Sequence, residues 1–256
     1  MNSFLTSYHT DVGIKKGKNQ DSILLKGIAI HENEIVLLAL CDGMGGMSKG
    51  ELASATVINE LSNWFQDVYM RCGSEWKDEE ILEQWKKLLN HVNNKLILYG
   101  KKEREQLGTT ATMVLLSSTG KYLIGHVGDT RAYRIGERIE QLTEDHSFVA
   151  REVRRGNMTL QQAAQDSRRN VLLQCIGINQ YLEPQFLRGE LKPGEAILVC
   201  SDGFRHEVTE KEIWSHLNPR IHNSESDIKK TLVVLTELNK QRMETDNISA
   251  IYIKKK

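Results

Sequence analysis

The chain has 256 residues, with 34 Lys or Arg and 34 Asp or Glu, so its formal net charge is zero. This balance, without a basic stripe, argues against a nucleic-acid-binding protein. No apolar run approaches the roughly 20 residues needed to span a bilayer, and no apolar signal-peptide core is present. The four cysteines show no CxxC spacing. We therefore expect a reduced, cytoplasmic chain with no membrane contact, and the lack of a low-complexity linker favours a single domain over residues 1–256.

The first half of the chain alternates strand-like apolar runs with two long amphipathic patterns. In the second pattern Ile81, Trp85, Leu88 and Val92 recur at helical spacing, which is typical of a helix that covers a sheet. The expected helices are Glu51–Met70 and Asp78–Tyr99. The expected strands are Phe4–Tyr8, a short run beginning near Asp21, Ile35–Leu40, Gly108–Leu116, Lys121–Asp129 and a continuation through Thr130–Tyr133.

The second half begins with a different kind of region. Thr143 with Asp145 or His146 could start a helix, but Ser147–Arg169 is polar and rich in Arg and Gln. Beyond it we expect short strands in Pro184–Gly194, a strand from Ala196 towards Asp202, helices Thr209–Leu217 and Ser226–Met243, and a final strand Ile248–Ile253. Thr209 and Glu212 have the spacing of a capping box. Strands and helices come in blocks rather than in regular βαβ order, which indicates an α+β fold with largely antiparallel sheets.

Five of the predicted strands carry an Asp at one end. Asp42 follows the apolar run Ile35–Leu40 and Cys41, and it precedes a glycine-rich turn. The other four members of the set are Asp21, Asp129, Asp202 and Asp246. Each alone could be an ordinary turn residue, and Asp42 could simply cap the helix that follows. Together they predict carboxylates gathered at one edge of a sheet. Such a cluster implies hard divalent cations, because bare carboxylates repel one another.

The order of these segments resembles the metal-dependent PPM (type 2C) serine/threonine protein phosphatases in their bacterial form. The matching motifs span nearly the whole chain. In chain order they are GKNQDS (Gly17–Ser22), CDGMGG (Cys41–Gly46), GTT (Gly108–Thr110), HVGDTRAY (His126–Tyr133), LTEDHS (Leu142–Ser147), CSDGF (Cys200–Phe204) and DN (Asp246–Asn247). A single Asp-Gly pair is uninformative, whereas this ordered set is specific.

The resemblance implies a four-layer αββα sandwich, in which two mostly antiparallel sheets pack face to face between outer helices. It also implies a flap at about residues 147–170, beside the active site. In such a protein Asp42 bridges two Mn2+ or Mg2+ ions, the Gly43 carbonyl ligates one of them, and Asp202 with Asp246 completes the other. Asp129 together with Asp202 holds a possible third ion, and Asp21 touches metal-bound water.

By the same resemblance, a hydroxide shared by the two ions attacks the phosphorus of phosphoserine or phosphothreonine. No protein nucleophile is needed, and neither Ser201 nor Thr130 has a paired base evident in the sequence. The family places a phosphate-binding Arg five residues before Asp21, where this chain has Lys16. An ammonium binds phosphate without the bidentate fork of a guanidinium, and a solvated loop lysine is the alternative.

The proton donor is a second departure from the family pattern. Where some members have a His two residues after the bridging Asp, or directly after the glycine pair, this chain has Met44 and Met47. Metal-bound water is the favoured donor, with His146 and His206 as alternatives, although His206 is also interpreted as an exposed loop residue.

Three classes of function follow. The first is a metal-dependent protein phosphatase, a monomer acting on phosphorylated proteins, among them a serine/threonine kinase and its substrates. The second is a phosphoprotein-sensing module that is catalytically weak. The third is a hydrolase of another phosphoester. The retained aspartates favour the first class.

Overall fold

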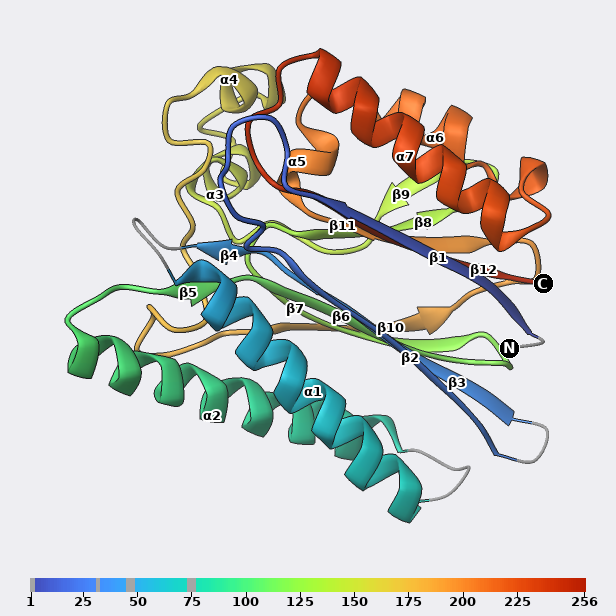
Figure 1. Ribbon diagram of the computed structural model, residues 1–256, viewed down its shortest axis with the longest axis horizontal. Helices are drawn as coiled ribbons and strands as arrows, with labels where there is room; N and C mark the ends of the chain where they lie inside the picture. Colours follow the sequence, from blue (N-terminus) through green and yellow to red (C-terminus); the bar gives the residue numbers. More distant parts are fainter. Residues whose placement is uncertain (1–2, 31–32, 45–48, 73–76) are drawn as a thin grey trace.

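The structure is a computed structural model that describes residues 3–30, 33–44, 49–72 and 77–256. Within them the chain forms two five-stranded antiparallel sheets that lie face to face, with helices on both outer sides (Figure 1). This confirms the predicted α+β sandwich with two antiparallel sheets. The two sheets matter for function because their central strands end side by side, at the left of Figure 1.

Each sheet is built from strands distant in the sequence. The first sheet has the order β1 (Phe4–Asp11), β12 (Ile248–Lys255), β11 (Ala196–Cys200), β8 (Arg131–Ile135) and β9 (Ile139–Gln141). The second has the order β10 (Gln185–Glu190), β7 (Lys121–Val127), β6 (Ala111–Ser117), β3 (Asn33–Cys41) and β2 (Ser22–Ile30). The short strands β4 (Gly43–Met44) and β5 (Gly108–Thr109) pair beside the second sheet.

The helices cover the outer faces of the sheets. The long helices α1 (Gly50–Cys72) and α2 (Asp78–Glu103) lie over the second sheet, and α6 (Glu210–Leu217) and α7 (Glu225–Gln241) lie over the first (Figure 1). The short α5 (Asp202–Arg205) follows β11 directly, and a single 3-10 turn, Pro219–Ile221, joins α6 to α7. Two more short helices, α3 (Phe148–Arg154) and α4 (Leu160–Gln165), stand apart in the predicted flap.

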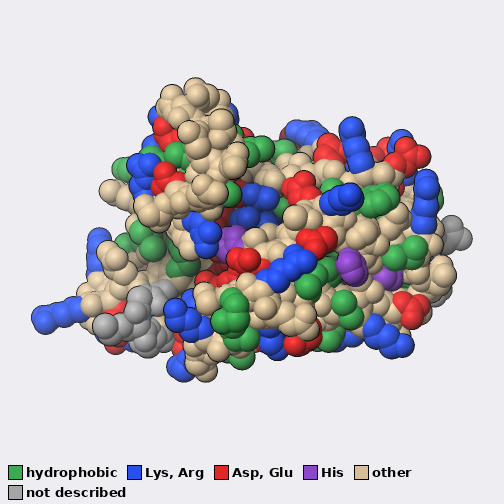
Figure 2. All heavy atoms as spheres, turned by 90° about the horizontal axis from the view of Figure 1, so that it is seen from above, with side chains coloured by type: hydrophobic (Ala, Val, Ile, Leu, Met, Phe, Trp, Pro, Cys, Tyr) green, Lys and Arg blue, Asp and Glu red, His purple; other side chains and the backbone are tan. Residues whose placement is uncertain are grey.

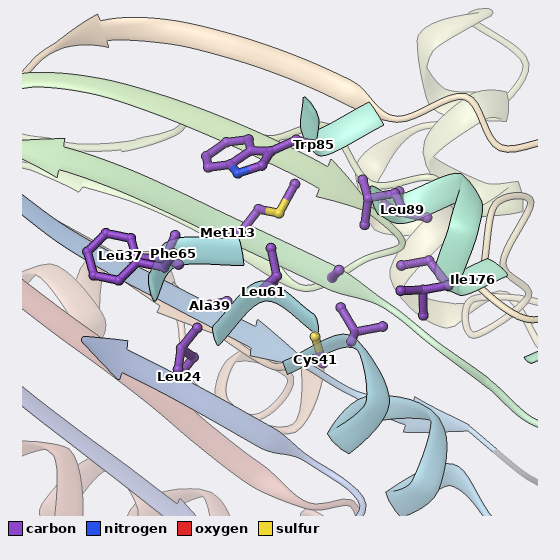
Figure 3. Close-up of a cluster of buried hydrophobic side chains, with 14 of the residues drawn as sticks. Leu24, Leu37, Ala39, Cys41, Leu61, Phe65, Trp85, Leu89, Met113 and Ile176 are labelled. Atoms are coloured by element: carbon purple, nitrogen blue, oxygen red, sulfur yellow. The ribbon is translucent and has the colours of Figure 1, made fainter. Parts of the chain in front are cut away.

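Three apolar layers fill the spaces between these four layers of structure. Trp85, Leu61 and Met113 belong to the layer between the helices α1 and α2 and the second sheet (Figure 3). Val36 and Val199 meet in the layer between the sheets, and α6 and α7 pack on the first sheet through the third layer. Burial of each large side chain contributes about 1.5–3 kcal/mol to stability.

Strand β3 shows why the sequence of a central strand is continuously apolar. Its residues Ile35, Leu37, Ala39 and Cys41 face the layer of α1 and α2. Val36, Leu38 and Leu40 face the other sheet. Because side chains alternate between the two faces of a strand and both faces are covered, every position from Ile35 to Cys41 must be apolar. The strand leaves the core only at Asp42, so this carboxylate stands at the end of a fixed element.

The structure corrects one predicted helix start and adds five short elements. Helix α3 begins at Phe148, capped by the Ser147 hydroxyl, and not near Thr143. Thr143 cannot serve as the cap, because its hydroxyl accepts a hydrogen bond from the Ala132 amide at 3.0 Å. The short β4, β9, α4 and α5 and the 3-10 turn were not predicted. The capping box of Thr209 and Glu212 at the start of α6 is confirmed.

Candidate active site

Asp42 is held at the end of β3 by the segment that begins β6. The Asp42 amide donates to the Thr110 hydroxyl at 2.9 Å. The Asp42 carbonyl accepts from the Thr110 amide at 2.9 Å and from the Thr109 hydroxyl at 2.8 Å. Thr109 and Thr110 therefore lie at the edge of the site. The amide and the carbonyl of Asp42 are thus both hydrogen-bonded, which fixes its backbone. Its carboxylate is left to face the neighbouring strand ends.

The other four predicted aspartates lie around Asp42. Asp202 is the first residue of α5, which follows β11, and Asp129 follows β7. Asp21 directly precedes β2, and Asp246 lies shortly before β12. Burial raises the pKa of the Asp42 carboxyl well above its usual range, and the charges of the other four aspartates raise it further. Elements from both sheets thus bring the five predicted carboxylates within electrostatic reach of one another.

Two further carboxyls of the cluster have a perturbed pKa. Burial raises the pKa of Asp21 to about 7, and the charges of Asp202 and Asp246 add to this. Burial and the charge of Asp202 likewise raise the pKa of Asp129 to about 7, against the opposing effect of Arg205. Burial and the charges of neighbouring carboxylates both oppose the ionisation of these groups. A cation placed among them stabilises their ionised form.

The donor set suits a hard divalent cation. Both carboxylate oxygens of Asp21 and the Oδ1 atom of Asp202 are buried without a hydrogen-bond partner among the described residues. Buried oxygens of this kind are costly unless a ligand or ion satisfies them. Among the described residues, no three acidic, His or Cys side chains are already drawn together as a closed metal cluster. The unpartnered carboxylate oxygens nevertheless fit Mg2+ or Mn2+ by chemistry, since both ions prefer oxygen ligands.

Lys16 is the cation nearest to this cluster. Its Nζ lies 2.9 Å from Asp246 Oδ1, and its side chain is 40% exposed. Burial opposes its charge, but the contact with Asp246 and the charges of Asp42 and Asp202 raise the pKa of Lys16 above its usual value. The loop that carries Lys16 is fastened by Asn247, whose amide donates to the Val12 and Lys18 carbonyls at 2.9 and 3.1 Å.

Glu244 links the two aspartates Asp202 and Asp246, and sequence reasoning missed it. Its Oε1 accepts hydrogen bonds from the amides of Thr245 and Asp246 at 2.7 and 2.8 Å. Its Oε2 lies 3.3 Å from His206 Nδ1, and His206 Nε2 lies 3.7 Å from Asp202 Oδ2. The interpretation of His206 as an exposed loop residue was wrong, since only 18% of its side chain is exposed.

Burial alone would lower the pKa of His206, but the contact with Glu244 and the charge of Asp202 raise it above the usual value. The other histidine considered, His146, has its pKa lowered by burial. Met44 lies in β4 beside the cluster, and Met47 lies outside the described residues.

Arg131 has a structural role beside the cluster. Its guanidinium donates two bonds of 2.8 Å to the two oxygens of Asp145. Arg205 donates to the Asp129 carbonyl at 3.0 Å and lies 3.5 Å from Asp145 Oδ2. Two arginines and one aspartate therefore brace the turn that carries Asp129. Asp145 carried no signal in the sequence beyond its place in the LTEDHS motif, and Arg205 follows the CSDGF motif without being part of it.

The hydroxyls near the site are occupied in the core. Thr130 bonds Thr112 at 2.7 Å, and Thr112 bonds His126 Nδ1 at 2.8 Å. All three residues are fully buried, and burial lowers the pKa of His126 to about 3. Ser201 is also buried and accepts a hydrogen bond from the Ser249 amide at 3.0 Å. None of these hydroxyls is placed to attack a substrate.

The sequence model of protein phosphatase 2C matches residues 13–240, which carry four of the five aspartates, all but Asp246. The chain belongs to the protein phosphatase 2C family. This confirms the family indicated by the ordered motifs.

The curated relatives include phosphatases from two bacteria. The chain is 28% identical over 252 residues to the serine/threonine phosphatase stp of Listeria monocytogenes, covering 97% of this chain and 94% of the relative. It is 29% identical over 211 residues to the protein phosphatase PhpP of Streptococcus pneumoniae, covering 80% of each.

Solved structures of the family share the fold. The serine/threonine phosphatase Stp1 from Staphylococcus aureus superposes with a TM-score of 0.83 at 28% identity, covering 98% of this chain and 94% of that one. The catalytic domain of PstP in complex with two manganese ions gives a TM-score of 0.80 at 25% identity, covering 98% of each chain. Among the described residues of our chain, no helix is both long and apolar enough to cross a bilayer.

Proposed function

We propose that this chain is a metal-dependent phosphatase that removes phosphate from phosphoserine and phosphothreonine in proteins. The observation that carries the proposal is the group of five aspartates, with unpartnered buried oxygens on Asp21 and Asp202. The protein phosphatase 2C family and the names of its bacterial members support the same activity.

The proposed ligands are those that the strand ends bring together. Asp42 would bridge two ions of Mn2+ or Mg2+, with the Gly43 carbonyl on one of them and with Asp202 and Asp246 on the other. Asp129 and Asp202 would hold a third, weaker ion. When bound, such ions supply Lewis-acid chemistry, because they lower the pKa of water and neutralise charge on a phosphoryl group.

The protein's own groups would orient the reactants. Asp21 has two buried oxygens without a partner among the described residues, which suit it to hold and align a water molecule. Lys16 would release Asp246 to a bound ion and turn its ammonium towards the substrate phosphate. The proton for the leaving serine or threonine would come from water, since Met44 offers none.

The partners and the setting of the enzyme stay predictions. A serine/threonine kinase and its substrates are the phosphoproteins we expect it to act on, as a cytoplasmic monomer formed by one domain over residues 1–256. Incubation with a phosphorylated candidate kinase, followed by phosphate analysis, would test this, and an unchanged phosphate content would count against it.

The first experiment is hydrolysis of a phosphothreonine peptide with Mn2+, with Mg2+ and with excess EDTA. We expect activity only with a divalent cation, and loss of activity in Asp42→Ala and in Asp202→Ala, because each change removes a carboxylate from the centre of the cluster. Asp67→Ala is the matched control, because Asp67 is exposed on α1 far along the helix from the cluster.

Each alternative function gives a different result. Hydrolysis in EDTA, or full activity in Asp42→Ala, would overturn the two-metal proposal. Faster hydrolysis of a nucleotide or a sugar phosphate than of any phosphopeptide would point to another phosphoester. A wild-type chain that binds Mn2+ in calorimetry and hydrolyses nothing would be a sensing module.

A further inference from the structure

A cavity of about 530 Å³ lies between the carboxylate cluster and the flap. Figure 2 shows acidic, basic and His side chains gathered in the hollow on this side of the molecule. The core side of the cavity is lined by Asp129, Asp145, Arg205 and His206, and the flap side by residues of α3 and α4. The cavity is therefore continuous with the site, because Asp129 belongs to both.

The flap side of the cavity carries a group of apolar side chains that belongs to none of the three apolar layers. Val149, Ala150 and Val153 of α3 line it, yet α3 has no fully buried residue. From α4, Leu160, Ala163 and Ala164 complete the wall, and Leu160 is 78% exposed. Apolar side chains gathered around an open cavity are stabilised when an apolar group of a ligand fills it.

The wall is fixed to the body of the protein at both ends. The Phe148 amide donates to the Val171 carbonyl at 2.8 Å, and the Leu173 amide donates to the His146 carbonyl at 2.7 Å. The Arg168 guanidinium lies 4.2 Å from the centre of the Phe148 ring. The hydroxyls of Ser147 and Thr159 cap the two helices. The cavity is thus formed before any ligand arrives, which reduces the entropy cost of binding.

The charged groups of the cavity favour an acidic ligand. Arg131 and Arg205 are paired with Asp145, and Arg154 is paired with Glu144. Arg169 has no carboxylate partner among the described residues, and its guanidinium contacts only the Ala164 carbonyl at 3.4 Å. The Nε of Arg205 is buried and has no hydrogen-bond partner among those residues. One guanidinium without a carboxylate partner in the described part of the chain, that of Arg169, therefore lines a largely apolar space.

We propose that this cavity binds the segment of a phosphoprotein substrate next to the phosphorylated residue. A branched aliphatic side chain such as Leu packs against Val153 and Leu160, and an acidic side chain of the substrate pairs with Arg169. The proposal rests on the proposed function. An extended chain advances about 3.3 Å per residue, so a substrate with its phosphate at the aspartates reaches this space within a few residues.

The test uses phosphothreonine peptides that are all Gly and Ser except for one Leu, moved through three positions on each side of the phosphothreonine. We expect kcat/KM to be about tenfold higher than for the peptide without Leu at one or two adjacent positions, as burial of one aliphatic side chain allows. Val153→Asp should remove this preference, and hydrolysis of p-nitrophenyl phosphate, which has no flanking residues, should keep its wild-type rate.

Leu160→Ser is a second variant that avoids a folding defect, because Leu160 is mostly exposed, and it should reduce the preference several-fold. For the acidic side chain, Arg169→Gln should remove a preference for Glu over Gln in the peptide. Arg155→Gln is the matched control, because Arg155 lies on the same flap and does not line the cavity. Equal kcat/KM for Leu and Ser at every position, or an undiminished preference in both Val153→Asp and Leu160→Ser, would overturn the proposal.

Failure of the proposed function gives a separate result. The same peptides, carrying a fluorescent label, are titrated with wild-type protein and Kd is read by anisotropy. A chain that hydrolyses neither peptides nor p-nitrophenyl phosphate would contradict the phosphatase activity. Equal Kd values for the Leu and Ser peptides would contradict the cavity proposal, whatever the activity.

Discussion

Glu244 acts on two proposed metal ligands without being one. It accepts hydrogen bonds from the amides that lead into Asp246, and through His206 it faces Asp202. Its side chain is nearly fully buried. Residues that hold metal ligands in place affect metal affinity almost as strongly as the ligands do. We therefore regard Glu244 as a positioning residue for the cluster.

Glu244→Gln should weaken Mn2+ binding by about 10–100-fold, because the amide keeps the shape of the side chain and loses the charge that orients His206. Isothermal titration calorimetry measures the Mn2+ affinity directly. Activity at saturating Mn2+ should recover most of its wild-type value. Glu137→Gln, with a side chain that is 92% exposed, is the control. Unchanged Mn2+ affinity in Glu244→Gln would show that the contact has no positioning role.

The aspartates were predictable and Glu244 was not, for a physical reason. Asp42 and Asp202 each end a run of apolar residues, and a charge at the end of a buried strand is conspicuous in a sequence. Glu244 is one charge in a polar loop, and its partner His206 is distant in the chain. Only folding brings them together. The same applies to Asp145, whose two arginines come from β8 and α5.

At the scale of elements, Gly43 packs backbone against backbone with Gly50 at the start of α1 and with Gln20. A Cβ atom added to Gly43 would lie 2.2 Å from the Gly50 carbonyl oxygen and 2.6 Å from that of Gln20. Both neighbours are main-chain atoms, so neither can turn aside. This close contact holds the first turn of α1 and the loop before β2 against the residue that follows Asp42.

Gly43→Ala should lower the free energy of unfolding by about 1–3 kcal/mol, as overpacking does in a rigid site, and should reduce activity by shifting Asp42. Urea denaturation measures the stability change. Gly17→Ala is the comparison, because nothing lies within 4 Å of the added Cβ atom. Equal stability of the two variants would mean that the backbone around Gly43 shifts to accommodate the extra methyl group.

Elements with a long periodic pattern were predicted well and short ones were not. Helices α1, α2 and α7 each extend over many residues with a repeated apolar face, and the structure has them close to the expected bounds. The strand β9 has three residues and α5 has four, which is too few for any period to show. The helix start at Thr143 was wrong because a long-range bond to Ala132 competes for that hydroxyl.

At the scale of the whole molecule, the carboxylate cluster couples stability to pH. Asp21 and Asp129 have a pKa of about 7 in the fold, against about 4 in an unfolded chain. The folded protein therefore binds more protons than the unfolded one between these values. Its free energy of unfolding must fall as pH rises through this window, because the stabilising protonated form is lost as pH passes the folded pKa.

Without a divalent cation, the melting temperature should decrease between about pH 5 and about pH 7.5. Mn2+ should raise it more at the higher pH, where the carboxylates bind the ion without first losing protons. Differential scanning fluorimetry in EDTA and in Mn2+ measures both slopes. Asp21→Asn should flatten the slope seen in EDTA. Identical slopes with and without Mn2+ in the wild-type protein would contradict the coupling.

The pairing of β1 with β12 has a consequence for how the chain folds. Phe4 is opposite Lys255 and Asp11 is opposite Ile248, and β12 lies between β1 and β11. During synthesis on the ribosome, β1 cannot pair with β12 until about 240 further residues have been made. The second sheet, complete once β10 has emerged, can form first. We infer a contact order high enough to make the first sheet the slow step of folding, and a need for protection of β1 until its partner is made.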